Sequence, residues 1–310
     1  MQRFSRSIWF LAATAAILAP AIRAIEIDYQ YDPNRHNRFL SGFSTNPVQN
    51  PNVLGMPSLD FSGVGWGSGG ELWKNVAMVT PQHFITADHA KPSVGSLLNF
   101  LGTDGVVRSY QVQSYIPLKY DAGNPANRSD LIVGQLSTPI LANVPIKIYS
   151  VVRPGPFKYP LSKTPPKNLD FYRGREMIVV GKNDFGGIDV DGDGYDDRGG
   201  KISKNIIDDV FVYDAGDAST NTVGVGFKSP PNTPDSGRFV GFDSGSPSFL
   251  LWDGQLTALG SHSGADFQAN PQYNVDGFLP YYIDQINSLI AGSGYQLNVL
   301  SPAQNKGHRK

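Results

Sequence analysis

Residues 77–90 read AMVTPQHFITADHA and contain the pattern from which the fold can be inferred. Two β-favouring runs, 77–79 and 83–85, are separated by the turn signal Thr80-Pro81-Gln82. Similar short runs recur between turn signals along the chain, at 106–110, 131–133, 177–180, 210–213, 223–227, 249–252 and 256–259. This spacing predicts an all-β protein built as an antiparallel sandwich or barrel.

The composition agrees with a β protein that has a substantial core. Of the 310 residues, 40% are hydrophobic, and there are 34 Gly and 23 Pro residues. Only three of the 27 acidic residues are Glu (Glu26, Glu71 and Glu176), and Asp favours turns where Glu favours helices. One amphipathic helix is predicted, over residues 281–290.

Charge and cysteine content exclude several classes of protein. With 26 basic and 27 acidic residues the net charge is -1, so we expect no nucleic-acid partner. The chain has no cysteine, which excludes a disulfide framework, a thiolate metal site and a cysteine nucleophile.

The N-terminus has the pattern of a secretory signal peptide. Residues 1–24 begin with Arg3 and Arg6, followed by an apolar stretch over 8–19 and by small residues at Ala21 and Ala24, either of which could precede the cleavage site. We prefer cleavage after Ala24. The apolar stretch is shorter than the ~20 residues that cross a bilayer. The sequence therefore predicts a secreted or periplasmic protein with no membrane span.

Three polar residues follow or precede apolar runs in places where a rigid scaffold could position them. His89 comes at the end of the second run quoted above, and Asp130 leads directly into the apolar run 131–133. Ser244 lies in the Gly-flanked turn 241–247, which reads GFDSGSP. A serine hydroxyl needs a base within hydrogen-bond reach, and the base needs a third group to orient it.

These segments, ITADHA, SDLIVGQL and DSGSP, resemble in order and context the motifs of the chymotrypsin-like, trypsin-type serine endopeptidases. The segment ALGSHSG (258–264) and the predicted terminal helix are similar to parts of the same family, so the resemblance covers about residues 60–291. It implies two antiparallel six-stranded β-barrels with a C-terminal helix. The predicted parts are a signal peptide (1–24), an N-terminal extension or removable prosegment (25–60), a protease domain (61–291, with barrels at about 61–150 and 151–291) and a polar basic tail (292–310).

The resemblance assigns a role to each of the three residues. Ser244 would be the nucleophile, His89 the base, and Asp130 the buried carboxylate that fixes the tautomer of the imidazole. The backbone N–H groups of Phe242 and Ser244 would form the oxyanion hole. The implied reaction is hydrolysis of a protein or peptide substrate through an acyl-enzyme.

The sequence departs from the family at several positions. Phe242 stands where the family has Gly, so either its peptide is held flipped until substrate binds or the role of the glycine moves to Gly241. Asp88 replaces a small residue. No Arg-Ile-Val-Gly-Gly activation site is present, so pairing of a freed N-terminal amine with Asp243 has no support in the sequence. Asp235-Ser236-Gly237 is a second Asp-Ser-Gly turn, and His36, His83 and His308 are expected to be solvated.

The resemblance also implies a substrate pocket. Arg238 would lie at its base, and Ser261, His262 and Ser263 would line its wall. A basic pocket favours an acidic side chain before the scissile bond. The alternative is that Arg238 pairs with an acidic residue or faces solvent.

Residues 189–200 read DVDGDGYDDRGG, which is the spacing of a calcium loop within a predicted insertion at about 183–205. The predicted oxygen ligands are Asp189, Asp191, Asp193, Tyr195 (through its carbonyl) and Asp197. The loop resembles EF-hand-like and thrombospondin-type loops but has Gly200 where an EF-hand has a bidentate Glu. We expect structural Ca²⁺ to bind at about 10⁻⁴–10⁻³ M.

The sequence therefore predicts a secreted, calcium-stabilised serine endopeptidase. Two alternatives stay open. One is a catalytically inactive, calcium-dependent binding protein on the same fold, and the other is a hydrolase of similar chemistry that acts on esters.

Overall fold

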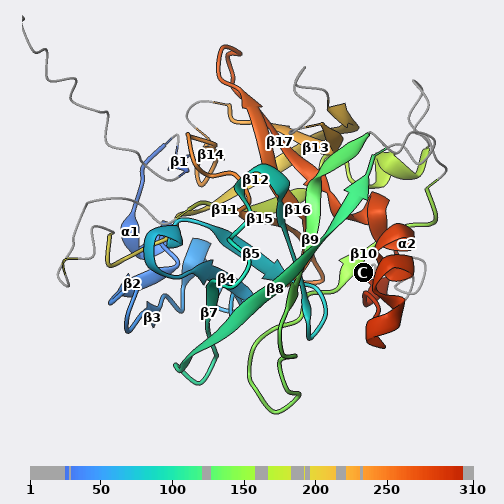
Figure 1. Ribbon diagram of the computed structural model, residues 1–310. Helices are drawn as coiled ribbons and strands as arrows, with labels where there is room; N and C mark the ends of the chain where they lie inside the picture. The colour runs from blue at the N-terminus through green and yellow to red at the C-terminus, as the bar shows by residue number, and fades with distance from the viewer. Residues whose placement is uncertain are drawn as a thin grey trace, which may run out of the picture.

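The computed structural model describes residues 25–27, 29–120, 127–157, 167–182, 192, 196–213, 221–230 and 233–302. Its described part contains two closed antiparallel barrels of six strands each, followed by a helix near the C-terminus (Figure 1). The predicted fold class is confirmed.

The first barrel has the strand order β4-β5-β6-β9-β8-β7. Its strands are β4 (Val64–Gly67), β5 (Asn75–Met78), β6 (His83–Ala87), β7 (Leu97–Leu101), β8 (Val107–Lys119) and β9 (Arg128–Leu136). The quoted segment 77–90 contains the end of β5, the turn that follows it and the whole of β6. The two strands pair with Ala77 opposite Ile85. At Gly134 the interior leaves no room for a side chain, because a Cβ atom would lie 2.0 Å from Phe84.

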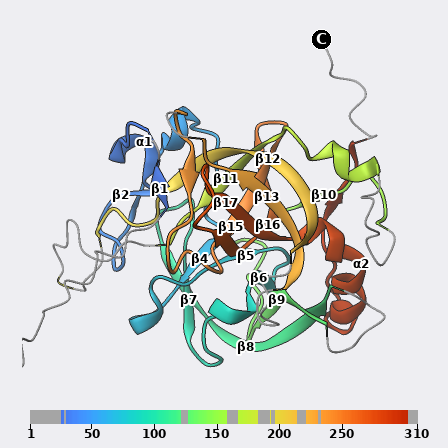
Figure 2. The same cartoon turned by 90° about the horizontal axis from the view of Figure 1, so that it is seen from above.

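The second barrel repeats this order as β11-β12-β13-β17-β16-β15. Its strands are β11 (Glu176–Val180), β12 (Ile202–Tyr213), β13 (Thr222–Lys228), β15 (Pro247–Trp252), β16 (Gln255–Asp266) and β17 (Tyr273–Phe278). Figure 2 shows the barrels beside each other, the first in blue to green and the second in yellow to red. One hydrophobic cluster joins them, with Ile85 and Val133 from the first barrel and Val225 and Phe278 from the second.

The helix α2 (Leu279–Ile290) includes the predicted helix 281–290 and starts two residues earlier, with Pro280 in its first turn, where a missing N–H costs nothing. It contacts β8 of the first barrel and β16 of the second, so it ties the two together. Among the described residues, no helix combines the length and apolar character that crossing a membrane requires.

The N-terminal segment is folded onto the body, unlike the polar extension expected from its sequence. It contains β1 (Glu26–Ile27), α1 (Pro33–His36), β2 (Phe39–Ser41) and β3 (Val48–Gln49). The strand β1 pairs with β14 (Gly237–Arg238) of the second half, and Ile25, Val53 and Leu54 belong to the core cluster. The sequence conceals this role because these apolar residues are scattered among Asn and Pro and have no regular period.

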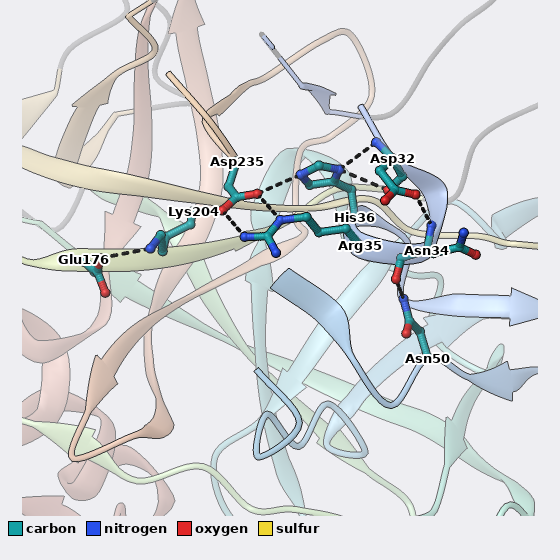
Figure 3. Close-up of polar contacts among 8 residues, drawn as sticks. All are labelled: Asp32, Asn34, Arg35, His36, Asn50, Glu176, Lys204 and Asp235. Carbon is teal, nitrogen blue, oxygen red and sulfur yellow. Dashed lines mark hydrogen bonds and ion pairs between the residues drawn. The ribbon is translucent and has the colours of Figure 1, made fainter. Parts of the chain in front are cut away.

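A partly buried ionic cluster fixes the same segment (Figure 3). The Arg35 guanidinium donates two hydrogen bonds to Asp235, at 2.6 and 2.7 Å, and His36 Nε2 lies 3.0 Å from the same carboxylate. Hydrogen bonding from Arg35 holds the pKa of Asp235 below its usual range. His36 and His83 are each 1% exposed, so the expectation that they are solvated was wrong, while His308 lies outside the described residues. The second Asp-Ser-Gly turn therefore serves to anchor the N-terminal segment.

The C-terminal tail was expected only as a polar basic segment, but it packs on the body of the protein over its described part, which ends at residue 302. The strand β18 (Val299–Leu300) pairs in parallel with β10 (Val151–Val152), and Leu297 is buried in the core. The pairing holds the end of the chain against the link between the barrels.

Tyr282 of α2 connects the two barrels through its hydroxyl group. The hydroxyl accepts a hydrogen bond from the Val223 N–H at 2.9 Å and another from the Ser129 hydroxyl at 2.9 Å. Ser129 directly precedes Asp130, so this network supports the strand end from which Asp130 projects.

We predict that Tyr282→Phe lowers the free energy of unfolding by about 1–3 kcal/mol, because it leaves the buried Val223 N–H without an acceptor. Leu289→Ala, on the exposed side of the same helix, should change it by less than about 0.5 kcal/mol. Urea unfolding of both variants measures the difference. Equal losses in the two variants would contradict the role given to the hydroxyl group.

Candidate active site

His89 and Asp130 are brought together by the pairing of two strands. β6 ends at Ala87, which lies opposite Leu131 of β9, and His89 follows in the short 3₁₀ turn Asp88–Ala90. His89 Nδ1 lies 2.8 Å from Asp130 Oδ1, and the backbone N–H of His89 donates to the same oxygen at 3.3 Å. The register of β6 on β9 therefore produces this pair.

The Asp130 carboxylate is completely buried, whereas the His89 side chain keeps 27% of its surface exposed. A carboxylate at Nδ1 holds a proton there, which leaves Nε2 as the basic nitrogen. Asp130 Oδ2 has no hydrogen-bond partner in the part of the chain that the structure describes. Asp88, whose partner the sequence did not reveal, forms an ion pair with Lys91.

Ser244 lies in a turn between β14 and β15 that is fixed to β16. The Gly245 N–H donates to the His262 carbonyl at 3.0 Å, and the His262 N–H donates to the Ser246 carbonyl at 2.9 Å. Ser244 itself stays partly exposed. The turn is thus a rigid support for an accessible hydroxyl group.

The same turn lies against the first barrel beside His89. Thr86, three residues before His89, donates from its hydroxyl to the Gly245 carbonyl at 3.2 Å, and Asn75 donates to the Ser246 hydroxyl at 3.1 Å. A Cβ atom at Gly245, where φ is +86°, would lie 2.8 Å from Thr86 Oγ1 and 3.5 Å from Ala90. The structure therefore places the segments that carry His89, Asp130 and Ser244 at one junction between the barrels.

Phe242 adopts the backbone conformation that normally requires glycine. Its φ is +72°, a region that costs a residue with a Cβ atom about 1–3 kcal/mol, while Gly241 has no positive φ. Among the described residues, the N–H groups of Phe242 and Ser244 donate to no protein acceptor. Both are therefore available to an oxygen atom of a ligand.

Asp243 holds the turn that carries Ser244 in place through its buried carboxylate. Its carboxylate accepts hydrogen bonds from the N–H groups of Lys182, at 3.0 Å, and Val240, at 2.8 Å. Burial raises the pKa of Asp243 to about 6, since the charged form is removed from water. The Lys182 ammonium donates to the Gly241 carbonyl at 2.8 Å and lies 5.1 Å from the Phe242 ring centroid.

The first residue after the preferred cleavage site reaches the same region. Ile25 is completely buried, and a Cβ atom at Gly181 would lie 3.0 Å from its backbone nitrogen. Gly181 directly precedes Lys182, whose N–H binds Asp243. The sequence offered no signal for this arrangement, because it depends on how residues more than 150 positions apart pack.

A cavity of about 370 Å³ opens beside Ser244 between the turn 239–244 and the end of β16. Of the predicted pocket residues, His262 and Ser263 line it, while Ser261 and Arg238 do not. Arg238 instead forms an ion pair with Glu26 at 2.8 Å, which is the alternative that the sequence left open. The positive charge that was expected at the bottom of the substrate pocket is therefore absent from the lining of this cavity.

His262 cannot replace that charge. Its Nδ1 lies 2.7 Å from Asp276 Oδ1 and its Nε2 lies 2.7 Å from the Val180 carbonyl, so both ring nitrogens are already bound. Its ring packs on Phe239, with centroids 4.0 Å apart. An acidic preference has no support from these contacts, and the remaining lining is mostly aromatic or small.

Most of the predicted calcium loop lies outside the described residues, including Asp189, Asp191, Asp193 and Tyr195. Asp197 is described, and it is buried with its carbonyl accepting the Phe43 N–H at 2.9 Å. Within the described ranges, no group of three or more His, Asp or Glu side chains could hold a metal ion. The calcium site stays a prediction.

Comparison with known proteins gives one kind of similarity. No family model matches the chain, and no curated protein matches it. Among solved structures it is similar to heparin binding protein and to a mutant of the human heparin binding protein, each at 15% sequence identity and a TM-score of 0.49. Each match covers 75% of this chain and 92% of the other. The assignment of the fold therefore rests on the strand topology described above.

Proposed function

We propose that this chain is a serine endopeptidase that hydrolyses peptide bonds through an acyl-enzyme. One observation carries the proposal, namely that a pair formed by the partly exposed His89 and the buried Asp130 adjoins the turn that presents Ser244. The two free N–H groups of that turn add the second requirement of acyl transfer, since they can stabilise the charge that develops on the carbonyl oxygen.

In the proposed reaction, His89 Nε2 takes the proton of Ser244 while the hydroxyl oxygen attacks the substrate carbonyl. Asp130 stabilises the imidazolium that results, without taking the proton itself. Each N–H donor to the oxyanion contributes roughly 2.7–4 kcal/mol in proteases of this kind. His89 then returns the proton to the leaving amine, and water completes the second half by the same route.

The cavity beside Ser244 suits an uncharged side chain before the scissile bond. Its charged lining residue, Asp243, uses both carboxylate oxygens to accept backbone N–H groups. The aromatic members Tyr213, Phe239, Phe242 and Phe267 give it an apolar surface.

We expect a fluorophosphonate to label wild-type protein at one site and to leave Ser244→Ala unlabelled, because only an activated serine displaces the leaving group at a useful rate. Intact-mass measurement detects the adduct. Ser236→Ala, in the second Asp-Ser-Gly turn, is the matched control and should label like the wild type. A folded wild-type protein that does not label would instead favour the inactive binding protein.

The proposal includes export and stabilisation by Ca²⁺. Five carboxylates within residues 189–197 repel one another unless a cation is bound. EDTA should therefore lower the unfolding temperature and the labelling, and Ca²⁺ should restore both. An unfolding temperature that does not respond to EDTA or Ca²⁺ would remove calcium from the proposal but leave the triad untouched.

We also propose that removal of the signal peptide after Ala24 completes the site. It would free the α-amine of Ile25 next to the buried Asp243 carboxylate, and the two charges would offset each other's cost of burial. The segment 25–60 would then remain in the active protein.

A chain that begins at Ile25 should therefore label with fluorophosphonate at least about tenfold faster than one that keeps Ala24. This factor corresponds to an activation free energy that is about 1.4 kcal/mol higher in the longer chain. The advantage should disappear as pH rises through the pKa of the amine, because the neutral amine no longer pairs with Asp243; an unpaired α-amine titrates near 8 and pairing raises this value. Asp243→Asn should remove the difference between the two chains. Equal rates for the two wild-type chains at pH 7 would contradict the pairing.

A further inference from the structure

Phe242 is an exposed aromatic residue in a place where its side chain is costly to accommodate. It lies two residues before the proposed nucleophile, its backbone has a φ of +72°, and the residue is 52% exposed. A glycine would meet the backbone requirement without strain and without exposing apolar surface to water. The ring therefore needs an explanation that the turn geometry does not give.

The ring of Phe242 does not stand alone. It packs edge to face against Trp73, with centroids 5.8 Å apart and an angle of 79° between the planes. Trp73 comes from the other barrel, two residues before β5, and its inner side packs against the cluster that contains Phe39 and Trp66. One rigidly supported ring and one exposed ring thus meet across the junction between the barrels.

Phe242 lines the cavity beside Ser244 and, at 52% exposed, lies at its edge toward the first barrel, where it meets Trp73. All residues that line the cavity belong to the second half of the chain, and Trp73 is not among them. A peptide with one side chain in the cavity and its carbonyl at Ser244 must continue away from the cavity. Beyond Phe242, the next aromatic surface that we expect such a peptide to meet is Trp73 of the first barrel.

We propose that Phe242 and Trp73 form a subsite for a large apolar side chain of the residue that follows the scissile bond. This proposal rests on the proposed endopeptidase function. An aromatic or branched aliphatic side chain would cover the exposed ring of Phe242 and remove apolar surface from water.

The nearby cations do not favour an acidic residue there. The Lys182 ammonium donates to the Gly241 carbonyl, and the Lys74 ammonium binds Glu71 at 2.8 Å and the Lys91 carbonyl at 2.9 Å. Both ammonium groups already have acceptors, so the aromatic faces are the main feature offered to a substrate.

The test compares peptides that differ only in the residue after the scissile bond, which is Ala, Leu, Phe, Asp or Lys. We expect kcat/KM for Leu and Phe to exceed that for Ala by about tenfold in the wild type. Trp73→Ala and Phe242→Gly should reduce this ratio to within about twofold. Trp73→Phe, which keeps an aromatic ring and guards against misfolding of the alanine variant, should retain most of it.

Phe267→Ala provides the matched control. Phe267 is also an exposed aromatic residue, at 58%, and lines the cavity as Phe242 does, but it makes no ring contact with Trp73. It should alter the preference for the residue before the scissile bond and leave the Leu-to-Ala ratio unchanged. A ratio that falls equally in this variant would overturn the proposal, because it would show a general loss of apolar contact.

Two further measurements separate the subsite from the proposed function. An ester with the same acyl part and a methanol leaving group has no residue after the reacting bond, so its turnover reports the triad alone. If the ester is turned over and Ser244 labels, but peptides are cleaved equally before Ala and Leu, the subsite is overturned and the proposed endopeptidase function stands. If Ser244 does not label, the proposed function fails, and the subsite is then tested by measuring how tightly the wild-type protein binds peptides that begin with Leu or Ala. Equal affinities overturn the subsite. Tighter binding of the Leu peptide that is lost in Trp73→Ala supports it.

Discussion

The buried carboxylate of Asp130 is the constraint on which the candidate site depends. It is completely removed from water, and one of its oxygens is bound by both the ring and the backbone N–H of His89. A buried carboxylate is stable only with such partners. The pairing of β6 with β9 must therefore hold its register, because a shift by one residue would direct Asp130 to the other face of the sheet.

A second buried carboxylate, Asp243, has the same importance for the turn that carries Ser244. Its two backbone donors come from Val240 within the turn and from Lys182 at the end of β11. The turn is bound on its other side by Thr86 and Asn75 of the first barrel. The proposed nucleophile and base therefore belong to different barrels, and their relative position depends on contacts across the junction.

The N-terminal segment takes part in the same arrangement without contributing a catalytic side chain. Ile25 packs against Gly181 and Gly237, and β1 extends β14, which leads through Phe239 into the cavity wall. Arg35 and His36 bind Asp235, which lies two residues before β14 begins. In a chain without disulfides, these partly buried ionic contacts help to fix the N-terminal segment.

The sequence by itself determined the fold class, the terminal helix and the three candidate residues His89, Asp130 and Ser244. It could do so because period-two runs, turn residues and short motifs are local properties. Only the tertiary structure decided that Arg238 pairs with Glu26, that both nitrogens of His262 are bound, that Ile25 packs against Gly181, and that Phe242 meets Trp73. The partners in these contacts lie between 14 and more than 200 positions apart. The closure of the barrels and their packing against each other choose such partners, and no local pattern of residues records that choice.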